Sequence, residues 1–205
     1  MQRLQMEIPE NCNDYNLPDM FINELYLLLK RTTDLCHENN INYWIDGGTL
    51  LGCVREKNQI PYDNDVDLGM LQDDYTKFIK ICVPILRKEF NYFCEEQAGP
   101  GFLKILSAVC GLQNTDDENN IVSPCLDIIV YHNFNGIIAI KERYIRHYYS
   151  KFRFLENNLF PLKREYIYKD LKLYGAINPY PYLERCYGDW NKRIYELKEY
   201  EINKT

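Results

Sequence analysis

The sequence predicts an α+β fold in which a small mixed sheet is flanked by helices and followed by a helical C-terminal part. Two observations predict this class. Stretches with helical spacing of apolar residues alternate with short β-branched and aromatic runs, and the 205 residues contain no internal repeat and no low-complexity linker. A chain of this length fits one compact domain, so we expect residues 1–205 to fold as a single unit.

Three helices are predicted from amphipathic spacing and end signals. The first follows Pro18 and runs to about Cys36, with apolar residues three and four apart. The second follows a capping cluster at residues 72–74, and we expect Pro84 to kink or shorten it. The third begins at Asn178-Pro179 and ends at Gly188.

The strands are predicted from apolar runs bounded by turn residues. Ile41–Ile45, Ile60–Met70 and Phe102–Val109 are three such runs. Leu126–Tyr131 and Ile137–Ile140 flank Asn135-Gly136, a pair typical of tight hairpin turns because both positions tolerate positive φ. A short helix is expected directly after Gly47-Gly48.

Composition excludes several classes of protein. A net charge of −6 argues against a general nucleic-acid binder, and no apolar run is long enough to span a bilayer. The first seven residues contain no apolar segment, so we expect no secretory signal and a cytoplasmic protein. The eight cysteines form no Cys-x-x-Cys pair, which favours reduced thiols over a zinc site or disulfides.

Three aspartates alternate along one predicted strand. Because alternate side chains share a strand face, Asp63, Asp65 and Asp67 point the same way and repel one another. A divalent cation removes that repulsion, and carboxylate oxygen is the ligand that Mg²⁺ and Mn²⁺ prefer. The alternative is a solvated acidic edge strand that discourages aggregation.

Two further segments favour the metal interpretation. Gly47, Gly48 and Thr49 stand between a strand and a helix, where backbone N–H groups and the Thr49 hydroxyl can bind phosphate, although a glycine pair is often only a turn. Asp127 is a lone charge in an apolar strand, so it requires a cation or a donor; a bond to a loop amide would also satisfy it.

The stretch Lys141–Lys172 reverses the charge balance of the chain. It contains nine Lys or Arg against four Asp or Glu, interleaved with tyrosines and phenylalanines. Such a segment could help to bind an anionic donor or stack on a sugar. A solvated face over a tyrosine-rich core is the interpretation we favour.

The motifs together resemble the LicD/fukutin family of phosphotransferases, which belongs to the nucleotidyltransferase-fold superfamily. The resemblance rests on Gly-Gly-Thr-Leu-Leu-Gly-x-x-Arg at 47–55 and Ile-Pro-Tyr-Asp-Asn-Asp-Val-Asp-Leu-Gly at 60–69. It continues at 126–128, at 160–162 and in the Tyr-Gly-Asp-Trp at 187–190, and so covers roughly residues 20–190. Tyr62 and Asn64 depart from the family pattern, but neither replaces an expected metal ligand.

The resemblance implies a metal-dependent transfer of a phospho-alcohol unit, such as phosphocholine or ribitol phosphate, from a CDP-activated donor to a sugar hydroxyl of a glycan. It implies Asp65, Asp67 and Asp127 as catalytic ligands of Mg²⁺ or Mn²⁺, with Asp63 orienting them. Phosphate contacts would come from Gly47, Gly48, Thr49 and Arg55, and from Lys104 unless that lysine faces solvent. A nucleotidyltransferase acting on a small-molecule or protein hydroxyl, and a non-catalytic nucleotide-binding relative, remain alternatives.

Overall fold

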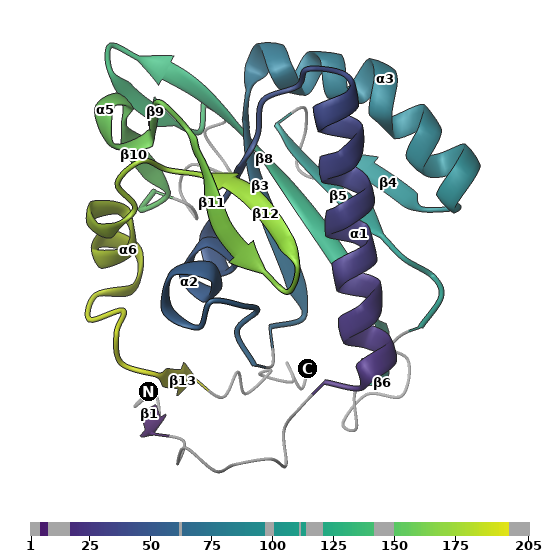
Figure 1. Ribbon diagram of the computed structural model, residues 1–205, viewed down its shortest axis with the longest axis horizontal. Coiled ribbons are helices and arrows are strands. Elements are labelled where there is room, and N and C mark those ends of the chain that lie inside the picture. The colour runs from purple at the N-terminus through teal and green to yellow at the C-terminus, as the bar shows by residue number, and fades with distance from the viewer. Residues whose placement is uncertain are drawn as a thin grey trace, which may run out of the picture.

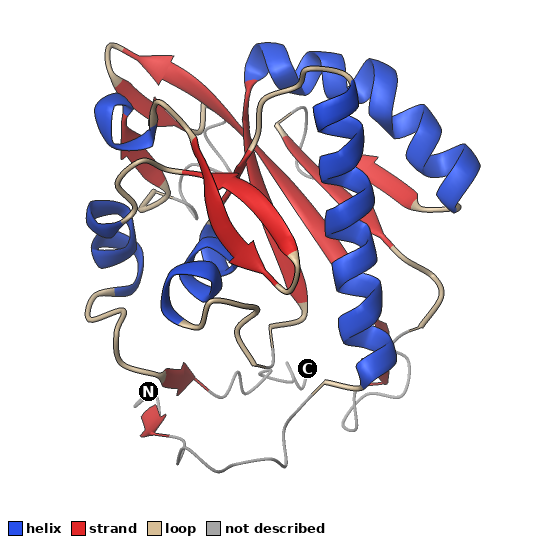
Figure 2. Ribbon diagram, in the orientation of Figure 1, coloured by secondary structure: helices blue, strands red, loops and turns tan. Residues whose placement is uncertain are grey.

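The computed structural model describes residues 5–7, 17–61, 63–96, 101–110, 112–113, 121–141 and 150–196. Its main feature is a curved mixed sheet of seven strands with helices packed against it (Figures 1 and 2). The helices are α1 (Asp19–Glu38), α2 (Gly47–Arg55), α3 (Gln72–Phe90), α5 (Glu156–Leu159) and α6 (Tyr180–Tyr187). The strands of this sheet are β2 (Trp44–Ile45), β3 (Asp65–Leu71), β4 (Phe93–Glu96), β5 (Phe102–Leu106), β8 (Cys125–Phe134), β9 (Ile137–Ala139) and β10 (Arg153–Leu155).

Strand β8 is the centre of the sheet. It pairs in parallel with β3 and antiparallel with β5 over its first half, and antiparallel with β9 at its far end. β2 extends the sheet beyond β3, β10 extends it beyond β9, and β4 pairs with β5. The N-terminal ends of β3 and β8 therefore lie side by side, so residues near these two strand starts are brought together.

Three two-stranded sheets lie outside this sheet. β11 (Lys163–Tyr168) and β12 (Leu171–Gly175) form a hairpin beside α2, on the same side of the large sheet as α1 (Figure 1). β1 (Gln5–Glu7) pairs with β13 (Ile194–Glu196), and β6 (Leu112–Gln113) pairs with β7 (Ile121–Val122). The C-terminal part thus contains helix α6, as expected, and also the short helix α5 and the β11–β12 hairpin, which were not predicted from the sequence.

One cluster of buried apolar side chains runs through the described part of the chain, from Leu28 to Leu183. α1 and α3 pack on each other and on β3 and β8, and their apolar stripes supply much of this cluster. None of the helices among the described residues is both long enough and apolar enough to cross a membrane. The seven described cysteines are all free, in agreement with the expected reduced thiols, and Cys12 lies outside the described residues.

Strands β2 and β3 both start later than the sequence predicted. β2 begins at Trp44 because the backbone before it is held by helices: the Ile41 N–H donates to Cys36 O, and the Asn42 N–H donates to Asp74. β3 begins at Asp65 because a turn precedes it, closed by the Asp63 N–H donating to Ile60 O.

The ends of α3 also differ from the prediction. The helix continues through Pro84 to Phe90, and the burial of Cys82, Val83 and Leu86 around the proline stabilises it there. No side chain caps its start, because the apolar Leu71 occupies the N-cap position, and Asp74 binds Asn42. β5 ends at Leu106 rather than Val109, and α6 begins at Tyr180, with Pro179 rather than Asn178 at the capping position. Gly188 ends α6 with a φ of 66°, as expected.

The hairpin predicted around Asn135-Gly136 is confirmed, with β8 and β9 as its strands. Asn135 has a φ of 52° and Gly136 a φ of 86°, the positive values that a two-residue hairpin turn requires.

Candidate active site

Three carboxylates meet at the start of the two parallel strands. Asp65 and Asp67 lie on β3, and Asp127 lies on β8 directly opposite Asp67 in the strand register. One oxygen from each of the three side chains lies within 4.8 Å of the others. This spacing and this all-oxygen donor set fit a hard divalent cation such as Mg²⁺ or Mn²⁺.

The electrostatics of the cluster are those of crowded like charges. Burial raises the pKa of Asp67 well above its usual range, and the neighbouring carboxylates, Asp65 first, raise it further. Burial also raises the pKa of Asp127, against the opposing effect of Lys104. A bound cation stabilises such crowded carboxylates in their ionised form, because it neutralises all of them at once.

Lys104 supplies a cation beside the cluster. It lies on β5 opposite Asp127, and its Nζ is 3.1 Å from Asp127 Oδ1. Cys125 completes the group, because its Sγ is 3.1 Å from Lys104 Nζ and 3.1 Å from Asp127 Oδ1. Lys104 therefore points toward the aspartates, and the alternative of a solvent-facing lysine is wrong.

Helix α2 begins against the same carboxylates, and carboxylate oxygens lie close to the backbone of the two glycines that open it. A Cβ on Gly47 would lie 2.4 Å from Asp67 Oδ2, and one on Gly48 would lie 2.7 Å from Asp63 Oδ2. Gly47 also has a φ of +48°, which favours glycine. The pair of glycines thus lets a helix N-terminus, with its partial positive charge, approach the acidic cluster.

The donors of this turn hold the carboxylates in place. The Gly48 N–H donates to Asp67 Oδ2 at 3.0 Å, and the Asp67 N–H donates to the buried hydroxyl of Thr49 at 2.8 Å. The Gly47 N–H donates to Asp46 Oδ1 and to the Tyr182 hydroxyl. The three residues of this turn that were predicted to bind phosphate therefore border the cluster. A direct phosphate contact from them stays a prediction.

Arg55 is the predicted residue that the structure does not bring to the cluster. It is the last residue of α2, eight residues after Gly47, which places it about 12 Å away along the helix. Its guanidinium pairs with Glu56 at 2.7 Å and donates to the carbonyl of Trp190. The expected contact with the leaving nucleotide therefore requires a ligand that extends along α2.

A buried acid lies behind the glycine turn and was not predicted from the sequence. Asp46 is fully buried and caps the start of α2. Its carboxylate accepts hydrogen bonds from the hydroxyls of Tyr131 on β8 and Tyr182 on α6, and its backbone N–H donates to Asp67 O at 3.0 Å. An aspartate directly between a strand and a helix is a common N-cap, so its position could have identified it.

Two other residues near the cluster were also missed. Cys125 precedes Asp127 by two, so strand alternation places both on one face. The pKa of Tyr187, at the end of α6, is raised well above its usual range by burial and then by Asp67. This tyrosine belongs to the Tyr-Gly-Asp-Trp segment quoted above.

Comparisons with known proteins identify the family of this chain. Residues 40–168 match the family described as LicD/FKTN/FKRP, nucleotidyltransferase domain. An uncharacterised protein of Rickettsia typhi is 31% identical over 181 residues, which are 87% of this chain and 50% of that protein. The lipopolysaccharide cholinephosphotransferase LicD of Haemophilus influenzae is 29% identical over 99 residues, 47% of this chain and 37% of that enzyme.

Shorter and more distant similarities also occur. The human ribitol 5-phosphate transferase FKRP is 50% identical over 34 residues, 17% of this chain and 7% of that enzyme. The lincosamide adenylyltransferase LnuA, solved with lincomycin bound, superposes with a TM-score of 0.47 at 20% identity over 82% of this chain and 85% of its own. The chain spans about half the length of the Rickettsia typhi relative. The match over residues 40–168 nevertheless contains both the glycine turn and the three aspartates, and the chain belongs to the LicD/FKTN/FKRP family.

Proposed function

We propose that this chain is a metal-dependent phosphotransferase that moves a phospho-alcohol unit from a CDP-activated donor to a sugar hydroxyl of a glycan. The observation that carries the proposal is the convergence of Asp65, Asp67 and Asp127 within 4.8 Å. The names of two relatives, a cholinephosphotransferase and a ribitol 5-phosphate transferase, support the chemical class.

Mg²⁺ or Mn²⁺, held by these three carboxylates, would supply positive charge to the oxygens of the donor diphosphate. Residues of the chain accept the proton and stabilise the developing charge. Asp127 accepts the proton of the attacking sugar hydroxyl through the carboxylate oxygen that does not hold the metal. The new bond joins that sugar oxygen to the transferred phosphorus, and the bond from phosphorus to the CMP oxygen breaks.

Lys104 and the glycine turn stabilise charge in this scheme. The Lys104 ammonium lies beside Asp127 and can turn toward the phosphoryl oxygens as negative charge builds on them. The Gly48 N–H and the Thr49 hydroxyl fix Asp67, so that its carboxylate does not have to reorganise during the reaction.

The test is a screen for release of CMP. Purified protein is incubated with CDP-choline, CDP-ribitol or CDP-glycerol, with candidate sugars, and with Mg²⁺, Mn²⁺ or EDTA. We expect metal-dependent CMP release with at least one donor, and its loss in Asp65→Asn, Asp67→Asn and Asp127→Asn. Asp189→Asn, an exposed change in the same segment as Tyr187, is the matched control and should retain activity.

The products distinguish this proposal from its alternatives. Free CMP together with a phospho-alcohol on the sugar supports it. A nucleotide attached to the acceptor would instead identify a nucleotidyltransferase. Donor binding without turnover, measured by calorimetry, would identify a non-catalytic relative.

A further inference from the structure

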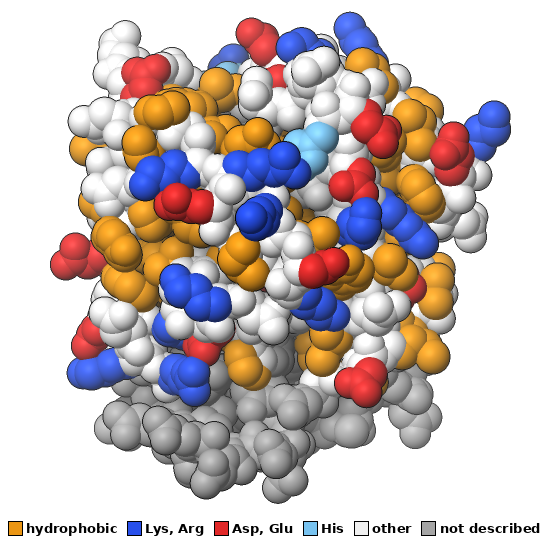
Figure 3. All heavy atoms as spheres, viewed as in Figure 1, with side chains coloured by type: hydrophobic (Ala, Val, Ile, Leu, Met, Phe, Trp, Pro, Cys, Tyr) orange, Lys and Arg blue, Asp and Glu red, His pale blue; other side chains and the backbone are white. Residues whose placement is uncertain are grey.

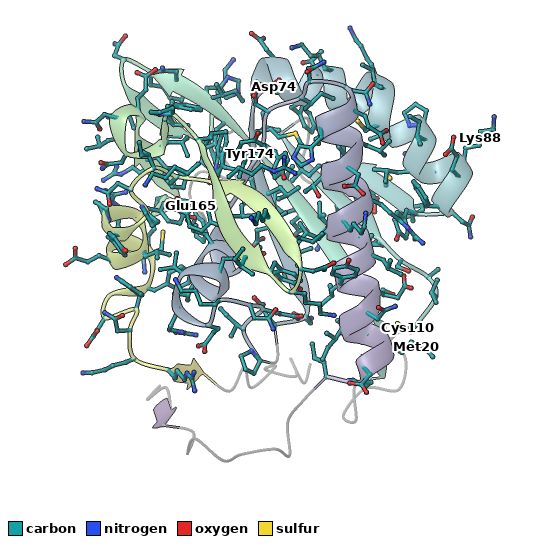
Figure 4. The ribbon with its side chains drawn as sticks, in the orientation of Figure 1. Met20, Asp74, Lys88, Cys110, Glu165 and Tyr174 are labelled. Atoms are coloured by element: carbon teal, nitrogen blue, oxygen red, sulfur yellow. The ribbon has the colours of Figure 1, made fainter. Side chains whose placement is uncertain are left out.

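A cavity lies away from the aspartate cluster. It has a volume of about 790 Å³, within the range of about 300–1,000 Å³ typical of small-molecule sites. It opens between the end of α1, strand β2 and the β11–β12 hairpin (Figure 4, where Asp74 and Tyr174 are labelled). The side chains that line it include His37, Tyr43, Asp74, Phe160, Arg164 and Tyr174.

This cavity is separate from the candidate active site. It meets β3 at Leu71, the last residue of the strand, whereas the cluster lies at the start of the strand. Leu71 is four residues beyond Asp67, or about 13 Å along the strand. None of the three clustered aspartates lines the cavity.

Arg164 gives the cavity an available cation. Its Nε donates to Lys172 O at 3.2 Å, and its guanidinium lies 5.7 Å from the centre of the Tyr174 ring. Across the described part of the chain, no carboxylate forms an ion pair with it. The two terminal nitrogens are therefore free to form the paired hydrogen bonds that a guanidinium makes with a phosphate or carboxylate.

The acidic group in the cavity wall does not compete for Arg164. Asp74 accepts the Asn42 N–H at 3.1 Å and the Asn42 side-chain amide at 3.2 Å, and Lys77 lies 3.7 Å away. The surrounding surface is basic although the whole chain carries −6. The hairpin segment 163–175 contains four Lys or Arg against two Asp or Glu, and basic side chains gather over it in Figure 3.

Aromatic rings form the remaining wall. The Tyr43 and Tyr174 rings meet edge to face at 5.8 Å, and His37 lies 5.6 Å from Tyr43 and 5.7 Å from Tyr174. The Tyr43 hydroxyl is held by His37 Nε2 at 3.2 Å. Tyr43 is fully buried, so the half-buried Tyr174 ring supplies the apolar surface, with a few fixed polar atoms beside it. This arrangement suits the C–H face and the hydroxyls of a sugar ring.

We propose that this cavity is a second ligand site, which binds a sugar carrying a phosphate or a carboxylate, with the anionic group on Arg164 and the ring against Tyr174. The choice of a sugar over another ring rests on the proposed function, whose acceptor is a sugar. The presence of an anionic group is inferred from Arg164, and the location of the site is inferred from the cavity. Neither inference depends on the proposed function.

Tryptophan fluorescence tests this proposal directly. The chain has two tryptophans, and Trp44 lines the cavity, so Trp190→Phe leaves Trp44 as the single reporter. Glucose 6-phosphate and glucuronate are titrated as probes, with uncharged glucose as the comparison. We expect a saturable change with at least one anionic sugar and a much weaker one with glucose. The probe that binds more tightly identifies phosphate or carboxylate as the preferred group.

Variants separate this site from the active site. In the Trp190→Phe background, Arg164→Gln should weaken binding about 10-fold or more, as expected for lost hydrogen bonds to a charged group. Lys172→Gln, on the same hairpin but outside the cavity wall, should change it less than about 2-fold. Asp127→Asn should leave it unchanged, because the active site is elsewhere. Circular dichroism checks that each variant folds.

Three results would overturn the proposal. The first is no fluorescence change with either anionic sugar up to about 10 mM, beyond the weak end of the usual affinity range. The second is equal binding by Arg164→Gln and Lys172→Gln. The third is loss of binding in Asp127→Asn, which would assign the signal to the active site. An absence of CMP release, in contrast, bears only on the proposed function.

Discussion

Asp67 of β3 and Asp127 of β8 are direct partners in a parallel strand pair. In that register their side chains leave the same face of the sheet, and Lys104, the partner of Asp127 on the other side, joins them. Three adjacent strands thus present two carboxylates and one ammonium group in a row across the sheet. This row explains why carboxylates that are 60 residues apart in the sequence can share one ligand.

Replacing Lys104 should separate metal binding from turnover. In Lys104→Gln, Asp127 loses its cation, so we expect Mn²⁺ to bind about 3- to 10-fold more tightly, because a competing positive charge is gone. The rate constant for transfer should nevertheless fall by about 100-fold or more, because charge on the phosphoryl group is no longer neutralised. Calorimetry and CMP release measure the two effects. A variant in which both quantities match the wild type would show that Lys104 has no role here.

The buried Asp46 network should contribute to stability. Tyr131→Phe removes the hydroxyl that donates to Asp46, and the unsatisfied buried oxygen should cost about 1–3 kcal/mol. Tyr180→Phe is the matched control, because this tyrosine is 57% exposed, and it should change stability by less than about 0.5 kcal/mol. Urea denaturation gives both free energies of unfolding. Equal values for the two variants would contradict the importance of the network.

Two glycines should respond differently to alanine. A Cβ on Gly69 would lie 2.3 Å from the buried Trp44 indole, so Gly69→Ala should destabilise the protein by about 1–3 kcal/mol or more. A Cβ on Gly48 would meet the end of the Asp63 side chain, which can rotate away. Gly48→Ala should therefore cost less than about 1 kcal/mol in thermal or urea unfolding. The reverse order of the two effects would contradict the packing described above.

Features that depend on residues close together in the sequence are predicted well, whereas features that depend on packing between distant residues are not. The glycine turn, the pair Asp65 and Asp67 on one strand, and the Asn135-Gly136 hairpin follow from local spacing and lie where expected. Pro84 does not shorten α3, which continues to Phe90, because packing on both sides of the proline holds the helix and a local rule for helices ignores such packing.

The missed features depend on contacts between distant segments. The hydroxyl of Tyr182 reaches Asp46 across 136 positions in the chain, and no periodicity reports such a contact. Arg55 illustrates the opposite case. Its spacing from Gly47 suggests one motif, but nine residues of helix place the two at opposite ends.

His37 should titrate below its ordinary pKa of 6.5, because burial and the nearby Arg164 charge both disfavour the imidazolium. Asp34 opposes this effect in part, and Tyr43 and Tyr174 also face the ring. A histidine whose pKa is lowered on folding takes up its proton more readily in the unfolded chain. Its contribution to stability is therefore complete above pH 6.5 and is lost as the pH falls through the folded value.

Arg164→Gln tests the electrostatic part of that shift. The variant should raise the His37 pKa toward 6.5, as followed by NMR titration of the imidazole proton, and weaken the pH dependence of stability below pH 6.5. Lys172→Gln should leave the titration of His37 close to that of the wild type. A His37 pKa that is identical in the wild type and Arg164→Gln would show that the two side chains do not interact.

The central claim is that side chains from β3 and β8 hold one divalent site. The most direct measurement is a calorimetric titration with Mn²⁺ of the wild type, Asp67→Asn, Asp127→Asn and the exposed control Asp189→Asn. We predict saturable binding by the wild type and the control, and a loss of affinity of about 10-fold or more in each cluster variant. Unchanged Mn²⁺ affinity in both Asp67→Asn and Asp127→Asn would contradict the claim.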